Sequence, residues 1–191
     1  MKGVNIFLAD GFEDIEALAT RDVLIRGGVE VQTVSIGEDP FVVSSHGLMV
    51  GVDTFIEDLD DTTGTGAGDV MIFPGGMPGS KNLAACKPLI RMMNRHYAEG
   101  GSVAAICAAP GFVLSQLKGI EEAVFTCYDG CDAQTTATGA VFVRKPAVTS
   151  GRIITGRGPG HTMDFALEVL KKIKGDEVAA KVAAGMILTC E

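Results

Sequence analysis

The chain has 191 residues, of which 47% are hydrophobic, and a formal net charge of −8. This length suits one compact core, so we expect a single domain over residues 1–191. A nucleic-acid surface needs clustered cationic side chains, whereas the 16 Lys and Arg residues are scattered along an acidic chain. The composition therefore argues against nucleic acid as a partner.

Two uncharged stretches have the composition of targeting or membrane segments. The first, Val4 to Ala9, ends at Asp10 without a cleavage-like sequence and does not fit a signal peptide. The second, Gly100 to Leu117, is interrupted by Pro110 and Gly111, which favours a buried strand followed by a buried helix over a membrane span. We expect a cytoplasmic protein that does not insert into membranes.

The five cysteines are odd in number and accompany no secretory signal, which predicts free thiols. Cys127 and Cys131 flank a turn, and none of the histidines has ligand spacing to a cysteine. We therefore expect no metal site.

Apolar runs alternate with helical patterns, which predicts an α/β fold with a mainly parallel sheet. In the first half we expect strands at Val4–Leu8, Glu30–Ser35 and Val70–Phe73, with a helix over Ile15–Arg26. A hairpin is expected from Phe41 to Val52, and the acidic loop Glu57–Asp69 should be the least ordered part. The apolar face predicted for the helix consists of Ile15, Leu18, Ala19, Val23 and Leu24.

The second half continues the alternation. A helix over Lys87–Glu99 precedes the strand Ser102–Ile106, and a further helix should run from Cys107 through Leu114. The remaining predictions are strands near Val124, Val141–Val143, Val148 and Ile153, and helices over Met163–Lys174 and Asp176–Met186.

The sharpest chemical signal is the run Val103-Ala104-Ala105-Ile106-Cys107-Ala108-Ala109-Pro110. A strand that turns sharply into a helix at a nucleophile requires small residues two positions before and after it, and Ala105 and Ala109 meet that requirement. The N-terminus of the helix should favour the thiolate and lower the pKa of Cys107. An inert, buried cysteine is the alternative.

Two further segments should lie near this turn. Gly75 and Gly76 follow a predicted strand, where their N–H groups could form half of an oxyanion hole, or only a turn. Near Asp10-Gly11-Phe12, three carboxylates begin a helix. Glu13 and Asp14 suit helix capping, whereas Glu16 lies deeper. A buried Glu16 beside the sulfur would become protonated and donate a hydrogen bond to it.

Four motifs in this order resemble the DJ-1/ThiJ/PfpI family of the class I glutamine amidotransferase-like superfamily. They are Gly11-Phe12-Glu13-Asp14-Ile15-Glu16, Pro74-Gly75-Gly76, Ala104-Ala105-Ile106-Cys107-Ala108-Ala109-Pro110 and Gly156-Arg157-Gly158-Pro159-Gly160. The resemblance implies a flavodoxin-like three-layer sandwich and a homodimer. It also implies Cys107 as the oxidisable nucleophile, Glu16 as its hydrogen-bond partner, and Gly75, Gly76 and Ala108 as backbone donors.

Two departures from the family pattern affect the expected chemistry. The peptidase branch has a histidine directly after the cysteine, and this chain has Ala108 there, which argues against proteolysis. The glyoxalase members carry a histidine in a segment that aligns with residues 125–128, where this chain has Tyr128. His46, in the hairpin turn, is a candidate substitute base, and an exposed turn residue is the alternative.

Two functions follow from the same thiol. As an enzyme, Cys107 would add to the aldehyde of methylglyoxal, glyoxal or an early glycation adduct, without a cofactor. As a redox sensor or chaperone, Cys107 would instead be oxidised to the sulfinate. The partners expected are a small aldehyde or an oxidant, and a thiamine-pathway role has no supporting residue.

Overall fold

The computed structural model describes residues 1–59 and 64–188. Its centre is a seven-stranded sheet in the order β10-β11-β7-β6-β1-β2-β5, parallel throughout except for the pair β10 and β11. Two small sheets pair β3 with β4 and β8 with β9. The strands are β1 (Val4–Leu8), β2 (Val31–Ser35), β3 (Phe41–Val43), β4 (Met49–Gly51), β5 (Thr54–Phe55), β6 (Val70–Phe73), β7 (Ser102–Ile106), β8 (Val124–Phe125), β9 (Val141–Phe142), β10 (Ala147–Ser150) and β11 (Ile153–Gly156).

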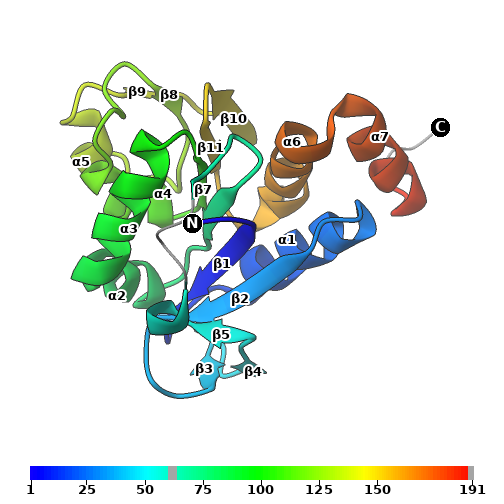
Figure 1. The fold of residues 1–191 in the computed structure, drawn as a ribbon. Coiled ribbons are helices and arrows are strands. Elements are labelled where there is room, and N and C mark those ends of the chain that lie inside the picture. Colours follow the sequence, from blue (N-terminus) through cyan, green and yellow to red (C-terminus); the bar gives the residue numbers. More distant parts are fainter. Residues whose placement is uncertain (60–63, 189–191) are drawn as a thin grey trace.

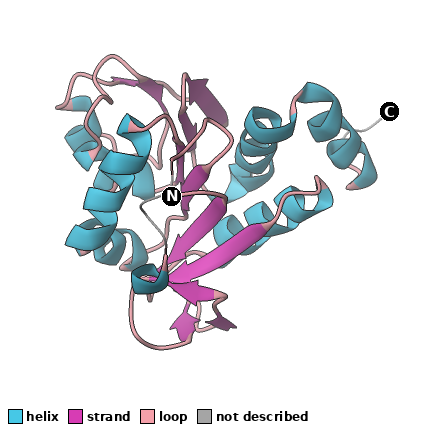
Figure 2. Ribbon diagram, in the orientation of Figure 1, coloured by secondary structure: helices cyan, strands magenta, loops and turns pink. Residues whose placement is uncertain are grey.

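Helices cover both faces of the large sheet, as Figures 1 and 2 show. One face carries α1 (Asp14–Arg26), α6 (Thr162–Lys174) and α7 (Asp176–Gly185). The other carries α2 (Gly79–Ala85), α3 (Lys87–Ala98), α4 (Ala109–Phe112) and α5 (Ala133–Thr136). The described residues also form three single-turn 3-10 helices: η1 (Ile56–Asp58), η2 (Leu114–Gln116) and η3 (Pro159–His161). This arrangement confirms the predicted flavodoxin-like sandwich.

The central strands divide the core into two apolar clusters. Successive strand residues point to opposite faces of a sheet. Ile6 and Ile72 accordingly pack on the side of α1 and α6, whereas Phe7, Met71 and Phe73 pack on the side of α3. Because both faces are covered, these strands are apolar at nearly every position, which is why the sequence revealed them.

The predicted apolar face of the first helix was partly wrong. Val23 and Leu24 are fully buried as expected, but Ile15 is 53% exposed. The buried face of α1 includes Glu16 and Thr20 instead. Periodicity of apolar residues could not reveal this rotation, because two polar side chains occupy inward positions.

Other elements differ at their ends or were not predicted. The second strand begins at Val31 rather than Glu30, and the helix after Cys107 ends at Phe112 rather than Leu114. The short elements β5, α2 and α5 were missed. Within the predicted loop Glu57–Asp69, residues 60–63 lie outside the described residues, and the Asp69 carboxylate accepts N–H bonds from Gly3 and Gly66, both at 2.8 Å.

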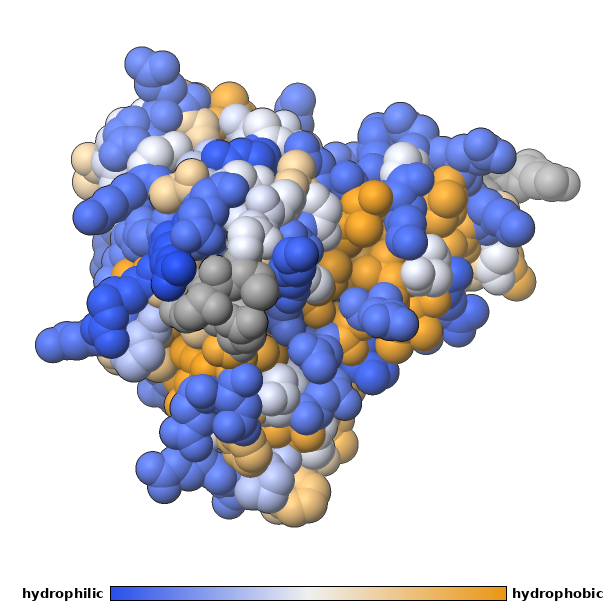
Figure 3. Space-filling model, in the orientation of Figure 1, coloured by the Kyte–Doolittle hydropathy of each residue, from blue (hydrophilic) through white to orange (hydrophobic). Residues whose placement is uncertain are grey.

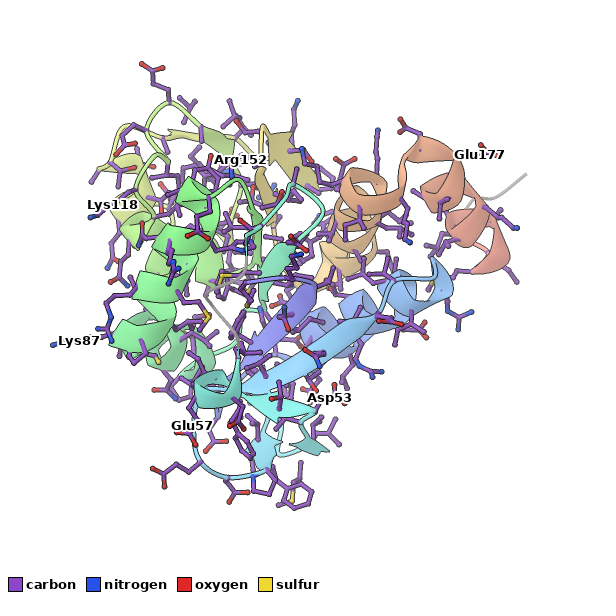
Figure 4. The ribbon with its side chains drawn as sticks, in the orientation of Figure 1. Asp53, Glu57, Lys87, Lys118, Arg152 and Glu177 are labelled. Atoms are coloured by element: carbon purple, nitrogen blue, oxygen red, sulfur yellow. The ribbon has the colours of Figure 1, made fainter. Side chains whose placement is uncertain are left out.

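Two further features concern the sheet edge and the helices. Asp53, labelled in Figure 4, fixes the approach to the edge strand β5 by accepting hydrogen bonds from Thr33 N and Oγ1, both at 2.8 Å. No helix among the described residues is long and apolar enough to cross a membrane.

The sheet order determines where a site can form. Strands β7, β6 and β1 are neighbours and parallel, so their carboxyl ends meet at one edge of the sheet. The segments that follow them contain Cys107, Gly75 with Gly76, and Glu13 with Glu16. The edge of an open α/β sheet at which strands end is where ligands usually bind.

Candidate functional site: a buried cysteine and glutamate

Cys107 directly follows β7, before Ala108 and α4, and has a strained backbone conformation. Its φ of 65° lies in the left-handed region, which non-glycine residues adopt at a cost. Two backbone hydrogen bonds hold it there: its N–H donates to Gly156 O at 3.0 Å, and its carbonyl accepts from Tyr128 N at 2.8 Å. The cysteine is therefore positioned by the strand end and by two loops distant in sequence.

The surroundings of the sulfur are small and supply backbone donors. Ala105 and Ala109 are fully buried, and Cys107 itself is 8% exposed. The N–H groups of Gly76 and Ala108 hydrogen-bond to the sulfur and act to lower the pKa of Cys107. The same two N–H groups face any oxygen that develops negative charge beside the sulfur.

Glu16 approaches Cys107 from the first turn of α1. Glu13 caps this helix, since its Oε2 accepts the Glu16 N–H at 2.8 Å. Glu16 is fully buried, and burial raises its pKa to about 7, against the lowering effects of hydrogen bonds from Gly75 and Cys107. Its Oε1 accepts no hydrogen bond of normal length from the described residues, so this oxygen is suited to carry the proton.

Gly75 must be glycine because it lies between the two functional side chains. A Cβ at this position would lie 2.6 Å from both Cys107 Cβ and Glu16 Oε2. Its N–H donates to Glu16 Oε2 at 2.7 Å. This N–H was expected to face a substrate oxyanion, and it instead holds the glutamate in place. That leaves Gly76 and Ala108 as the donors at the sulfur.

The prediction that the pKa of Cys107 is lowered overall was wrong, although the Ala108 N–H at the N-terminus of α4 acts in that direction. Burial is the main influence and raises the pKa of the thiol, and the Glu16 carboxylate raises it further. The helix α4 has only four residues, so its dipole is small. A protonated Glu16 therefore favours the thiolate of Cys107 more than an ionised Glu16 does.

Tyr128 contacts the sharp turn at Cys107 between β7 and α4, here called the elbow, through its backbone N–H, and the residue is 53% exposed. It lines a cavity of about 340 Å³ together with Asp129, Arg157 and the turn Gly158–His161. Arg157 donates to both carboxylate oxygens of Asp129, at 2.9 and 3.1 Å. The Arg157–Asp129 ion pair therefore lines this cavity, and the backbone N–H of Tyr128, another lining residue, donates to the Cys107 carbonyl.

His46 lies on the turn between β3 and β4 and forms an ion pair with Asp14. No hydrogen bond between His46 and Cys107 occurs among the described residues. Glu13, Asp14 and His46 offer three ligand atoms within 4.8 Å of one another, which makes them the candidate cation ligands in the described part of the chain. Cys127 and Cys131 belong to no such group there.

Sequence reasoning missed the contact between His46 and Asp14. The two residues are 32 positions apart, and only the docking of the hairpin brings them together. An isolated bridge pairs Phe12 with Ser44, and Gly11 N donates to Val43 O at 2.8 Å. No local pattern in either segment could have signalled this contact.

The model of the DJ-1/PfpI family matches residues 2–172. Protein DJ-1 homolog B of Arabidopsis thaliana is 34% identical over 187 residues, which cover 98% of this chain and 42% of the relative. The glutathione-independent glyoxalase DJR-1.2 of Caenorhabditis elegans is 33% identical over 165 residues, which cover 86% of this chain and 84% of that protein. This chain thus spans less than half the length of the Arabidopsis relative.

Solved structures agree with the sequence relatives. A crystal structure of a mutant DJ-1 superfamily protein from Salmonella typhimurium has a TM-score of 0.85 and 32% identity, with all of both chains covered. The structure of oxidized Toxoplasma gondii DJ-1 has a TM-score of 0.86 and 29% identity, with 98% of each chain covered. The family model, the relatives and the fold agree, and the chain belongs to the DJ-1/PfpI family.

Proposed function

We propose that this protein is an enzyme that uses Cys107 to convert reactive aldehydes, methylglyoxal among them, without a cofactor. The observation that carries the proposal is the pairing of a cysteine on a strained elbow with a buried carboxyl group whose pKa is raised to about 7. A group that titrates near neutral pH can both accept and donate protons during turnover. One relative, from Caenorhabditis elegans, is named a glutathione-independent glyoxalase.

The first chemical step is addition of the sulfur to the aldehyde carbon. The thiol gives up its proton, a carbon–sulfur bond forms, and the carbonyl oxygen becomes the hydroxyl of a hemithioacetal after protonation. The Gly76 and Ala108 N–H groups stabilise the negative oxygen in the transition state. Glu16 receives the thiol proton and returns a proton to that oxygen.

The remaining steps convert the adduct into lactate. Glu16 removes the hydrogen of the former aldehyde carbon as a proton, giving an enediol, and reprotonation of the neighbouring carbon gives a thioester. Water cleaves the thioester and releases lactate with the free thiol. The net change is methylglyoxal plus water to lactic acid, so the reaction balances with no oxidant or reductant.

Tyr128 takes the position at which glyoxalase relatives were expected to carry a histidine. A phenol is mostly protonated at neutral pH, so it donates a hydrogen bond more readily than it accepts a proton. We infer that Tyr128 orients substrate oxygen in the cavity that it lines, and that proton acceptance falls to other groups. Turnover should therefore be slow.

A second candidate function is redox sensing through oxidation of Cys107. A peroxide would convert the thiolate to the sulfenate with release of water, and a second peroxide would give the sulfinate. The donors at Gly76 and Ala108, with a protonated Glu16, suit the oxygens of that product. Because the similar Toxoplasma gondii protein has been solved in an oxidized form, this candidate is worth a direct test.

We also propose a homodimer located in the cytoplasm. Apolar side chains are exposed on the hairpin and on the neighbouring helix: Phe41, Leu48 and Met49 on the former, Ile15 and Ile25 on the latter. Figure 3 shows further apolar surface between α1 and the pair α6 and α7. Free thiols at Cys86, Cys107, Cys127 and Cys131 suit a reducing compartment.

The test is a methylglyoxal-to-lactate assay on the wild type, Cys107→Ser and Cys86→Ser. We expect Cys107→Ser to abolish lactate formation, because a serine hydroxyl without an adjacent strong base is a far weaker nucleophile. Cys86→Ser removes a half-buried thiol between α2 and α3 and should leave the rate unchanged. Equal rates for all three proteins would refute the enzyme proposal, and peroxide titration of Cys107 would then decide the sensing role.

A further inference from the structure

The cavity beside Tyr128 contains an arginine that the proposed reaction does not use. Its volume is about 340 Å³, and besides Tyr128 it is lined by Asp129, Arg157 and the turn Gly158–His161. Cavities of this size hold small organic molecules. Methylglyoxal is uncharged, so it offers no group with which the arginine could form an ion pair. A lining of this kind suits a substrate that itself carries a negative charge.

The two loops that line this cavity also hold the backbone of Cys107. Gly156 O accepts the Cys107 N–H at 3.0 Å, and Tyr128 N donates to the Cys107 carbonyl at 2.8 Å. Arg157 directly follows Gly156 in the chain, and Asp129 directly follows Tyr128. Because consecutive Cα atoms are about 3.8 Å apart, both charged residues begin one short step from the elbow. A molecule that extends from Cys107 into the cavity therefore needs a chain of only a few bonds.

Arg157 is held in place and still has unused hydrogen-bond donors. Its backbone N–H donates to Pro146 O at 3.0 Å, and its Nη2 donates to both carboxylate oxygens of Asp129, at 2.9 and 3.1 Å. No other hydrogen bond of this side chain occurs in the described part of the chain, and the side chain is 28% exposed. A guanidinium group carries five N–H donors in a planar fork that matches a carboxylate. The Nε and Nη1 donors of Arg157 are therefore open to a ligand.

The charges beside the cavity favour a ligand with one negative charge. Arg144 Nε lies 3.8 Å from Asp129 Oδ1, and Arg157 Nη2 lies 2.9 Å from the same oxygen. Two guanidinium groups and one carboxylate leave a net charge of +1. His161 and Asp164 form a further, exposed pair at 3.1 Å. The carboxylate of Asp129 would repel a dianion such as a phosphate monoester, so a carboxylate suits this cavity better.

The ring of Tyr128 forms an apolar wall of the cavity. A Cβ at Gly158 would lie 3.3 Å from Tyr128 Cδ2, so the ring packs directly on the backbone of this glycine. An aromatic ring in this place suits the methylene groups of a short chain. No hydrogen bond of the Tyr128 hydroxyl occurs among the residues that the structure describes, which leaves it open to a carbonyl oxygen of the ligand.

We propose that Arg157, held by Asp129, binds the carboxylate of a 2-oxoaldehyde whose aldehyde carbon is attacked by Cys107. This inference rests on the proposed function and names its substrate class: 2-oxoaldehydes that carry a carboxylate at the far end of a short chain. The steps described for methylglyoxal then convert 4,5-dioxopentanoate and one water to 2-hydroxyglutarate. The carboxylate bound by Arg157 takes no part in bond making, so the reaction again balances with no oxidant or reductant.

The first test measures kcat and KM for 4,5-dioxopentanoate, for its uncharged methyl ester and for methylglyoxal. We expect Arg157→Gln to raise KM for the acid about 10- to 100-fold with kcat unchanged, because charged hydrogen bonds that hold substrate and transition state equally are lost. The constants for the ester and for methylglyoxal should not change. Arg157→Lys keeps the charge without the planar fork and should restore part of the affinity.

The matched control is Arg26→Gln. It breaks another arginine–aspartate pair, the exposed one between Arg26 and Asp22 on α1, and removes the same charge from the protein. All the constants should stay at their wild-type values in this variant.

A second test needs no turnover. N-iodoacetylglycine and N-iodoacetylglycinamide alkylate a thiolate by forming a carbon–sulfur bond with release of iodide. They place a carboxylate or an uncharged amide as many bonds from the sulfur as 4,5-dioxopentanoate places its carboxylate. We expect Cys107 of the wild type to react about 10-fold faster with the acid than with the amide, and Arg157→Gln to remove this preference. Peptide mapping by mass spectrometry identifies the alkylated cysteine, and the ratio of the two rates within one protein cancels any loss of folded material.

The possible outcomes separate this inference from the proposed function. If wild type makes neither lactate nor 2-hydroxyglutarate but shows the alkylation preference that Arg157→Gln removes, the enzyme proposal fails and the carboxylate site stands. If wild type converts methylglyoxal through Cys107 and Arg157→Gln binds 4,5-dioxopentanoate as well as wild type does, the carboxylate site is wrong and the enzyme proposal stands. An equal loss for methylglyoxal and the acid, or a wild type that alkylates no faster with the acid, also overturns the carboxylate site.

Discussion

At the scale of single residues, the site depends on the lack of a side chain at Gly75 and on the backbone conformation of Cys107. Gly75 lies between Cys107 and Glu16, where there is no room for a Cβ. Its N–H donates a hydrogen bond that holds the Glu16 carboxylate in place. Cys107 is held at positive φ by hydrogen bonds to Gly156 and Tyr128. The reactivity of the thiol therefore depends on whether the neighbouring Glu16 carboxyl group holds a proton.

Burial of Glu16 also predicts how stability depends on pH. Its pKa is raised from 4.5 to about 7, so the stabilising effect of the proton is fully present below pH 4.5 and is lost as pH rises through about 7. The shift corresponds to about 3 kcal/mol. Glu16→Gln, which has no proton to lose, should remove this loss.

The measurement is the free energy of unfolding in urea for wild type and Glu16→Gln, at pH 5 and at pH 9. The wild type should lose about 3 kcal/mol more than the variant between the two values. Burial lowers the pKa of His96, so that side chain destabilises the fold in acid, but it is common to both proteins and cancels in the difference. Parallel pH profiles for the two proteins would show that Glu16 is ionised throughout.

At the scale of elements, α4 shows how the elbow is supported. The helix ends at Phe112, whose carbonyl accepts hydrogen bonds from the side chains Ser115 Oγ and Gln116 Nε2. Gly111 packs directly against the carbonyl of Cys131, which belongs to the loop that begins at Tyr128. This contact joins the helix after Cys107 to the loop that holds its carbonyl.

Gly111→Ala should therefore destabilise the protein, because the new Cβ would overlap the Cys131 carbonyl and the backbone would have to move. We expect a loss of about 1–3 kcal/mol in the free energy of unfolding, the usual cost of overpacking. Gly185→Ala near the end of α7 meets no atom within 4 Å and should stabilise by up to about 1 kcal/mol. Urea unfolding of both variants checks the contrast; two changes of the same sign would contradict it.

The success of prediction also follows the elements. Strands β1, β6 and β7 are apolar runs buried on both sides, and the motif at Cys107 needs small neighbours, so both left a clear signal in the sequence. The strand β5 has two residues and α5 has four, too few for periodicity to show. The roles of Gly75 and His46 depend on contacts between segments far apart in the chain, which spacing alone does not encode.

At the scale of the whole molecule, the exposed apolar side chains bear on how the site is covered. Phe41, Leu48 and Met49 extend from the hairpin, and Ile15 lies beside Asp14 at the start of α1. These side chains flank the group formed by Glu13, Asp14 and His46. A second copy of the chain seated there would shield this apolar surface from water.

The proposed dimer makes a prediction that does not depend on catalysis. Met49 is 63% exposed on the hairpin, so Met49→Glu should leave the monomer folded but place a charge in the interface. Light scattering after gel filtration should give twice the monomer mass for wild type and the monomer mass for Met49→Glu. The matched control is Val141→Glu, which changes a 52% exposed residue on β9, at the opposite end of the molecule from the hairpin, and should stay dimeric (Figure 1). A wild type that is monomeric at all concentrations, or a Val141→Glu that alone dissociates, would show that the hairpin does not form the interface.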